Sequence, residues 1–237
     1  MLQALSHLSW LQLLLLSLAI NIVLFASSVG LYTLVKKFST QELIQEKEQK
    51  LSKGDLQLAL LVLVCNSAVF LLGEYLWERG FIIVSEKESV FTILLQIGVL
   101  VGGMDFLMYV FHRIAHLPGL YSLVHGKHHE HSSVNILSLF VLHPVEAIGF
   151  GMLFIVLLLL YPFNVWAITA YLTINLIWGT IGHLNQEVLK ETRLKKWISK
   201  VLCLSVFHNR HHQYPDCNYG FYTLFWDKIF KTYRTEN

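Results

Sequence analysis

The chain has 237 residues, of which 54% are hydrophobic and only 14% are charged. Soluble domains carry about 25% charged residues, and the mean hydropathy of +0.52 indicates that much of this surface does not face water. These values exclude a disordered chain, a solenoid of polar repeats and an ordinary soluble enzyme. The net charge is only +2, and no basic run is interleaved with aromatic residues, so nucleic-acid binding is not expected.

Two residue types qualify this first description. Histidine occurs 12 times, although an imidazole is costly within a bilayer unless it has a function there. The three cysteines, Cys65, Cys203 and Cys217, form no C-x-x-C pair. Cysteine therefore predicts no zinc knuckle, no iron–sulfur cluster and no disulfide framework.

Apolar segments of the length that crosses a membrane dominate the first three quarters of the chain. A transmembrane helix needs about 20 apolar residues, and residues 10–35, 56–77 and 90–111 each qualify. No Lys or Arg precedes Lys36, which favours a first span over a cleaved signal peptide. The longer run 147–178 is interrupted by Tyr161-Pro162-Phe163-Asn164, a turn signal, and predicts a helical hairpin with a short first arm.

These segments predict an all-α, polytopic membrane bundle of about four or five membrane helices. Residues 1–89 are expected to form N-terminal membrane helices and a polar connector (36–55), and residues 90–237 a catalytic domain. The positive-inside rule places the connector in the cytosol. All Lys and Arg except Arg79 and Lys87 then lie on that side, together with every histidine from His112 onward. A cytosolic, histidine-rich helical region is therefore expected to cap the bundle.

The histidines between positions 112 and 212 recur at spacings that suit metal binding. His112 and His116 are four residues apart, which places both on one helix face. Two H-x-x-H-H motifs follow, and His183 stands alone at the end of the hairpin. A chain with this histidine frequency is expected to contain about 0.03 H-x-x-H-H motifs by chance, so two of them are very unlikely to be accidental. The candidate metal ligands are His112, His116, His125, His128, His129, His183, His208, His211 and His212.

The three remaining histidines are not the primary candidates for metal ligands. His143 precedes a proline and suits a turn or a supporting position, since a residue before proline is restricted to extended backbone. His131 suits a supporting or surface position, with ligation still possible, and His7 is given no role.

Nine imidazoles are too many for one ion and suit two. Imidazole binds zinc, copper, iron and nickel. No H-E-x-x-H motif of a zinc hydrolase occurs, and no Glu-x-x-His pair of a soluble di-iron bundle is found among these groups. Histidines around two ions at a membrane face favour oxygen activation and lipid C–H oxidation. A zinc-dependent membrane hydrolase and a non-catalytic metal transporter or sensor are the alternatives that the sequence leaves open.

The ordered histidine series and the tail resemble the fatty acid hydroxylase / sterol desaturase superfamily of membrane di-iron oxidases. The similarity covers roughly residues 103–234, whereas the first hundred residues match only as generic membrane spans. Beyond the histidines, the family pattern is matched by Leu120-Tyr121, His143-Pro144-x-Glu146, Asn218-Tyr219-Gly220 and Trp226-Asp227-Lys228-Ile229-Phe230.

The resemblance implies a centre of two iron ions held by neutral imidazoles. It implies O2 as oxidant, a lipid substrate from the bilayer of sterol or fatty-acyl type, and hydroxylation or desaturation of a C–H bond. Two electrons per turnover are expected from a separate cytochrome- or ferredoxin-type protein at the cytosolic face. Residues expected to orient the ligand rings are Asp105, Glu130, His143, Glu146, Glu187 and Asp227, together with Asp216. Loop structure or helix capping explains Asp216 and Asp227 equally well.

Two positions depart from the family pattern. Lys231 stands where the family usually has glycine, which changes a tail motif and no ligand. Some members have a second histidine four residues after the middle one, but here His183 is followed by Glu187. A tenth ligand is therefore Asn185, Glu187, water or absent.

A basic stretch near the C-terminal histidines has two interpretations. Arg193, Lys195, Lys196 and Lys200 could dock an acidic electron carrier. Positive-inside anchoring at the membrane surface explains the same charges equally well. The membrane is expected to be a bacterial inner membrane or the endoplasmic reticulum.

Overall fold

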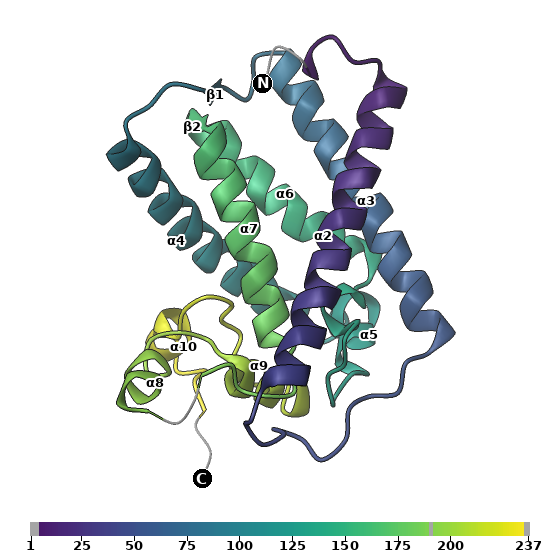
Figure 1. Cartoon of the computed structure of the whole chain (residues 1–237), viewed down its shortest axis with the longest axis vertical. Coiled ribbons are helices and arrows are strands. Elements are labelled where there is room, and N and C mark those ends of the chain that lie inside the picture. Colours follow the sequence, from purple (N-terminus) through teal and green to yellow (C-terminus); the bar gives the residue numbers. More distant parts are fainter. Residues whose placement is uncertain (1–4, 190–191, 235–237) are drawn as a thin grey trace.

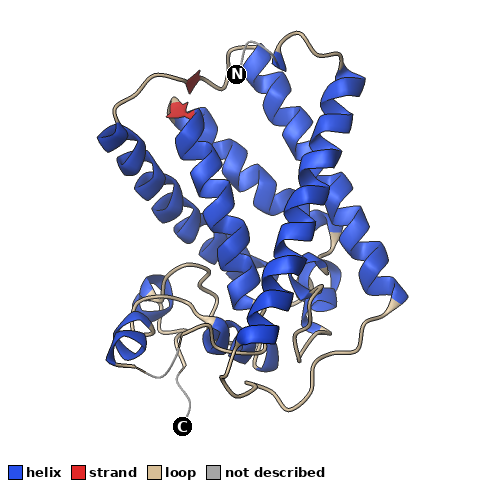
Figure 2. Cartoon of the chain, in the orientation of Figure 1, coloured by secondary structure: helices blue, strands red, loops and turns tan. Residues whose placement is uncertain are grey.

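The computed structural model describes residues 5–189 and 192–234, which are mostly helical (Figure 2). Lys190, one of the expected cytosolic cations, lies outside the described residues. Among the described residues, four helices are long and apolar enough to cross a membrane: α2 (Trp10–Phe38), α3 (Lys53–Glu78), α4 (Val90–Ala115) and α7 (Val165–Gly182). They contain the predicted spans, so the prediction of an all-α membrane bundle is confirmed.

Polar side chains at the helix starts explain where these spans begin. The hydroxyls of Ser9, Ser52 and Ser89 and the amide oxygen of Asn164 each accept a hydrogen bond from a backbone N–H of the first turn. Such caps satisfy donors that a helix start otherwise leaves unpaired. α6 (Pro144–Leu160) has 17 residues and forms the short first arm of the predicted hairpin.

The hairpin packs against α4 to form the main apolar core. Leu100 and Met104 of α4 meet Ile155 of α6 and Tyr171 of α7 in one buried cluster. Two short parallel strands, β1 (Val84–Ser85) and β2 (Phe163–Asn164), join the α3–α4 loop to the hairpin turn at one end of the bundle (Figure 1).

The N-terminal helices complete this bundle. Ser28 of α2 hydrogen-bonds Thr180 of α7 with an Oγ–Oγ1 distance of 2.7 Å, and both groups are buried. The amide of Asn21 donates to Ser67 of α3. Close contacts join α3 to α6, where a Cβ on Gly151 would lie 2.7 Å from Val69. The two parts that the sequence predicts therefore share one interior.

Shorter elements gather at the end of the bundle opposite the two strands (Figure 1). They include six of the 12 histidines and lead into the C-terminal tail. These elements are a π-helical turn η1 (Tyr121–His125), α5 (Gly126–His129), a 3₁₀ turn η2 (Ser138–Phe140), α8 (Arg193–Ile198), α9 (Ser205–Gln213) and α10 (Phe225–Ile229).

The polar connector between α2 and α3 has a structural role that the sequence does not predict. The backbone N–H and C=O of Gln45 exchange two hydrogen bonds of 2.9 Å with the side-chain amide of Asn185. Asp55 lies 3.3 Å from Nε2 of the buried His131. The connector is thus held against the histidine-bearing elements.

The α3–α6 contact generates a stability prediction with a matched control. Gly151→Ala adds a methyl group against the stiff side chain of Val69, whereas Gly98→Ala on α4 points into open space. Both variants gain helix propensity, but overpacking costs about 1–3 kcal/mol. The free energy of unfolding in detergent is therefore expected to be about 1–3 kcal/mol lower for Gly151→Ala than for Gly98→Ala. Equal stabilities would contradict the packing described here.

Candidate metal centre

The structure brings all nine candidate ligands together in two groups. Within each group, every ring offers one nitrogen atom, and these nitrogen atoms all lie within 4.8 Å of one another. Group A comprises His112, His116, His125, His129 and His211, and group B comprises His128, His183, His208 and His212. The rings of His129 in group A and His212 in group B are stacked with centroids 5.0 Å apart, so the two groups are immediate neighbours.

The two H-x-x-H-H motifs are shared between the groups in a reciprocal way. In the first motif, His125 and His129 belong to group A and His128 to group B. In the second motif, on α9, the outer pair belongs to group B and His211 to group A. A helix turns about 100° per residue, so positions i and i+4 are about 40° apart, whereas i+3 points about 100° away from i+4. Each motif can therefore contribute to two adjacent ions.

Helix ends position the other ligands. His112 lies in the last turn of α4 and His116 is its C-cap residue, while His183 is the C-cap residue of α7. The first motif begins in the π-helical turn η1 and continues into α5. The ligands thus come from elements that end at one level of the bundle.

The spacing between ring nitrogens fits a metal coordination sphere. In group A, Nε2 of His125 lies 2.9 Å from Nε2 of His112 and 3.1 Å from that of His129. In group B, Nε2 of His183 lies 3.3 Å from that of His128 and 3.1 Å from that of His208. Ligand nitrogens about 2.1 Å from a metal would be about 3.0–3.4 Å apart, for octahedral to tetrahedral angles.

The hydrogen bonds of the Nδ1 atoms show why the short contacts between Nε2 atoms need a cation between them. Nδ1 of His112 donates to the carbonyl of Tyr219 at 2.8 Å, and Nδ1 of His125 donates to the Glu146 carboxylate at 2.6 Å. Their Nε2 atoms are then both lone-pair acceptors, so they cannot hydrogen-bond each other. The same holds for the other rings whose Nδ1 meets a backbone carbonyl: His128 with Val141, His183 with Gly179 and His211 with Cys217.

Burial keeps these rings neutral. It lowers the pKa of His183 to about 4 and that of His129 to about 3. Burial, followed by neighbouring imidazoles, also holds the pKa values of His208 and His212 well below the usual range. Neutral imidazole is the form that binds metal. The residues therefore fit two metal ions of the kind that imidazole prefers, and their ligation stays a prediction.

The candidate supporting residues have different roles. Glu146, 1% exposed, is the one whose carboxylate contacts a ligand ring within the described part of the chain. Glu130 is exposed and pairs with Lys127, which directs it away from the rings. Asp216 pairs with Arg234 at the surface.

Two aspartates act on the tail instead of directly on a ring. Asp105 of α4 accepts from the backbone N–H of Tyr222 at 2.9 Å and from the Thr223 hydroxyl at 2.5 Å. Asp227 accepts from the backbone N–H groups of Tyr219 and Gly220 at 2.8 and 2.7 Å. Since the Tyr219 carbonyl holds the ring of His112, Asp227 supports that ligand through the backbone.

The backbone conformation of the tail motif (residues 218–220 and 226–231) explains its residue types. Asn218 has φ 61°, a conformation that asparagine tolerates. A Cβ on Gly220 would lie 2.6 Å from the Thr223 carbonyl, so a side chain does not fit there. Lys231 has φ 58°. The glycine that the family usually carries at this position would adopt that angle without the cost of about 1 kcal/mol.

The remaining candidates bind backbone groups. His143 caps α6 by accepting from the N–H of Val145, which is the turn role expected for it. The Glu187 carboxylate accepts from the N–H of Val206 at 2.8 Å, and Asn185 is held by Gln45. His131 lies between Ser138 and Asp55. Glu187 does not belong to group B, which has four imidazoles within the described residues.

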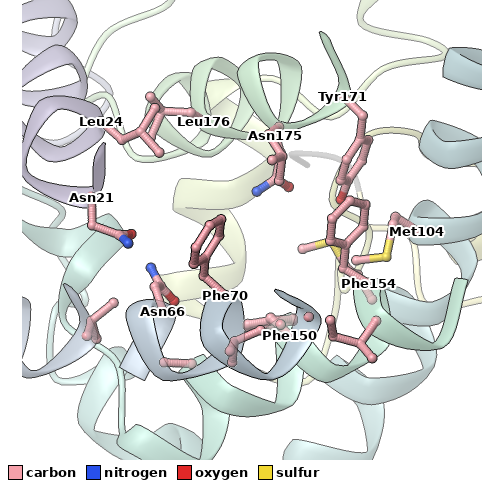
Figure 3. Close-up of a pocket in the computed structure, with 18 of the residues that line it drawn as sticks. Asn21, Leu24, Asn66, Phe70, Met104, Phe150, Phe154, Tyr171, Asn175 and Leu176 are labelled. Carbon is pink, nitrogen blue, oxygen red and sulfur yellow. The ribbon is translucent and has the colours of Figure 1, made fainter. Parts of the chain in front are cut away.

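A long apolar cavity of about 500 Å³ leads from the histidines into the bundle. His112, His125 and His183 line one end, and Val165, at the start of α7, lines the other. Val165 and His183 are 18 residues apart, or about 27 Å along the helix. Figure 3 shows the few polar side chains that project into the open centre from α2, α3 and α7, namely Asn21, Asn66 and Asn175.

The chain belongs to the fatty acid hydroxylase family. The family model described as "Fatty acid hydroxylase" matches residues 97–232, which is more than half of the chain and includes all nine histidines. This confirms the resemblance to the fatty acid hydroxylase / sterol desaturase superfamily. No solved structure matches the chain.

Several curated relatives are similar to part of the chain. A Delta(7)-sterol 5(6)-desaturase of Aspergillus fumigatus is 29% identical over 143 residues, covering 60% of this chain and 40% of that protein. The corresponding desaturase of Leptosphaeria maculans is 26% identical, with 60% and 38% covered. A very-long-chain aldehyde decarbonylase of Oryza sativa is 30% identical, with 61% and 23% covered. The chain thus spans less than half the length of these relatives.

Glu146 and Glu130 form a matched pair for testing the geometry. Glu146→Gln replaces the carboxyl group that contacts Nδ1 of His125, and loss of such a partner lowers metal affinity about 10–100-fold. Glu130→Gln changes an exposed side chain and is expected to leave affinity unchanged. Competitive chelator titration of the purified, metal-loaded protein measures both values. Equal affinities for the two variants would contradict the role assigned to Glu146.

Proposed function

We propose that the chain is a membrane-bound oxidase that uses O2 and two external electrons to hydroxylate or desaturate a lipid C–H bond. One observation carries this proposal: two adjacent groups of neutral imidazoles, all buried except the partly buried His116, open onto an apolar cavity between membrane helices. The names of the relatives, sterol desaturases and aldehyde decarbonylases, support lipid chemistry of this kind.

Groups A and B would each hold one iron ion, and bound iron supplies O2 activation and C–H oxidation. The chain's own residues position the substrate. Met104, Met108 and Phe150 line the cavity with apolar side chains, which exclude water and align a lipid tail. His112 and His125 belong to group A and line the same cavity, so the reacting carbon would lie at that end.

The alternatives fit these features less well. A metal transporter needs polar groups along a path across the membrane, but this cavity is lined mainly by apolar side chains. A zinc hydrolase needs a water nucleophile next to the metal. An apolar cavity leading to the ligands favours attack on a hydrocarbon instead.

We propose that the histidine end of the bundle faces the cytosol, in a bacterial inner membrane or the endoplasmic reticulum. The exposed cations Arg193, Lys196 and Lys200 lie on and beside α8, in the same tier as α9. This charge distribution follows the positive-inside rule. A separate electron-donor protein of cytochrome or ferredoxin type would then approach from the cytosol.

The α8 surface supports both interpretations of the basic stretch. Trp197 is 74% exposed and Leu194 66% exposed, and such side chains beside lysines suit a membrane interface. The double variant Lys196→Glu/Lys200→Glu is expected to lower turnover at least about threefold with a protein donor, because docking is electrostatic. Turnover driven by dithionite is the control and is expected to be unchanged. An equal loss with both reductants would indicate membrane anchoring instead.

The central prediction concerns His128 and His211, one from each group. Purified protein is expected to contain about two iron ions per chain. Alanine at either position should remove one of them and abolish O2-dependent oxidation. His7→Ala, at an exposed position remote from the groups in sequence, is the control and should retain activity. Iron is measured by elemental analysis, and products by mass spectrometry of lipids from cells with and without the gene product.

Specific outcomes would overturn this function. Zinc as the only bound metal, together with turnover that continues without O2, would indicate a hydrolase. Unchanged oxidation by His128→Ala and His211→Ala would refute the assignment of the ligands.

A further inference from the structure

A buried carboxylate lies in the wall of the cavity, well away from the histidines. Glu74 of α3 lines the cavity and is only 7% exposed. Its Oε1 has no hydrogen-bond partner in the part of the chain that the structure describes. A carboxyl group inside a membrane helix is expensive and usually marks a functional site.

Glu74 shares its helix face with side chains that clearly enter the cavity. Asn66 and Phe70 project into the open centre in Figure 3, and Glu74 follows Phe70 by four residues. Positions i, i+4 and i+8 lie on one side of a helix. Glu74 therefore extends this row about 12 Å beyond Asn66, toward the end of the cavity farther from the histidines.

The α6 helix provides a scale for the distance to the metal groups. Glu146 on α6 holds the ring of His125, and Ile155, nine residues later, packs against Gly73 next to Glu74. Nine residues correspond to about 14 Å along a helix. The carboxylate and the proposed site of oxidation are thus about 14 Å apart along one cavity.

Within the described residues, no cation pairs with Oε1 of Glu74. Arg79, five residues further along the chain, is exposed and lies over the ring of Tyr75. The cavity wall around Glu74 is apolar and includes Phe70 and Trp77. A ligand that places a hydrogen-bonding group here would relieve the cost of the unpaired oxygen.

We infer that Glu74 binds the hydroxyl group of a lipid whose opposite part is oxidised at the histidines, an inference that rests on the proposed function. A hydroxyl can donate to a carboxylate oxygen and accept from a protonated one, and it enters an apolar cavity without carrying charge. A free fatty-acid carboxylate would be repelled by an ionised Glu74. The residue therefore selects hydroxyl-bearing lipids and fixes which end enters first.

The position of Glu74 in the chain suits a specificity role. The family match begins at residue 97, so α2 and α3 lie outside it. The histidine end of the cavity belongs to the matched region, whereas the Glu74 wall is contributed by α3. This division allows the substrate-selecting end to differ among proteins that share the same metal ligands.

Four probes with one C16 chain test the inference without requiring turnover. The full chain in lipid nanodiscs is titrated with 1-hexadecanol, hexadecane, palmitate and hexadecyltrimethylammonium, in competition with tritiated 1-hexadecanol. The wild type is expected to prefer the alcohol about 10-fold over the alkane, as for a hydrogen bond to a buried carboxyl group. Glu74→Leu should reduce this ratio to about 1, while Glu74→Gln, which still hydrogen-bonds a hydroxyl, should retain most of it.

Glu78→Gln is the matched control, because Glu78 lies one turn further on the same helix and is exposed. It should keep the wild-type preference. Glu74→Ala replaces Glu74→Leu if the leucine variant does not fold. An unchanged alcohol preference in the apolar variant, no preference in the wild type, or tightest binding of the ammonium probe with loss in Glu74→Gln would each overturn the inference.

These outcomes are separable from the proposed function. Histidine-dependent oxidation together with a Glu74-independent preference would leave the oxidase intact and refute the hydroxyl site. A Glu74-dependent preference without any O2-dependent product would support the site as a lipid site and refute the oxidase.

Discussion

The arrangement of this molecule depends on one electrostatic constraint, the burial of imidazole lone pairs that face each other. Nε2 of His112 lies 2.9 Å from that of His125, and Nε2 of His128 lies 3.3 Å from that of His183. The Nδ1 atoms of these four rings already donate to backbone carbonyls or to Glu146. Such an arrangement is repulsive unless a cation occupies the centre. The connector and the tail, which otherwise look like loops, supply contacts that hold the rings in place.

The second feature is the relation between the metal groups and the membrane. α4 and α7 end at the histidines, and the cavity runs back between the same helices. Under the proposed function, a lipid would reach the histidine end without leaving an apolar environment. Polar side chains along this path are few, so each of them, including Asn66 and Glu74, would have a large influence on which lipid fits.

Carboxylates show how poorly residue type alone predicts a role. Asp105, Glu130, Glu146 and Asp227 are all near histidines in sequence or in the tail motif, yet Glu146 alone among them contacts a ligand ring within the described residues. Asp105 and Asp227 hold the tail, and the tail presents the Tyr219 carbonyl to His112. Backbone carbonyls orient four of the other eight ligand rings, and no sequence pattern identifies a carbonyl acceptor.

The sequence by itself determined the membrane helices and the nine candidate ligands, because hydropathy over 20 residues and histidine spacing are local properties. It also predicted the short first arm of the hairpin from Pro162. Only the tertiary structure decided how the histidines divide, with His128 and His211 each joining the opposite group from their motif neighbours. That division depends on the direction of each ring relative to another helix. Cavity shape and the unpaired Glu74 likewise arise only when α3 packs against α6.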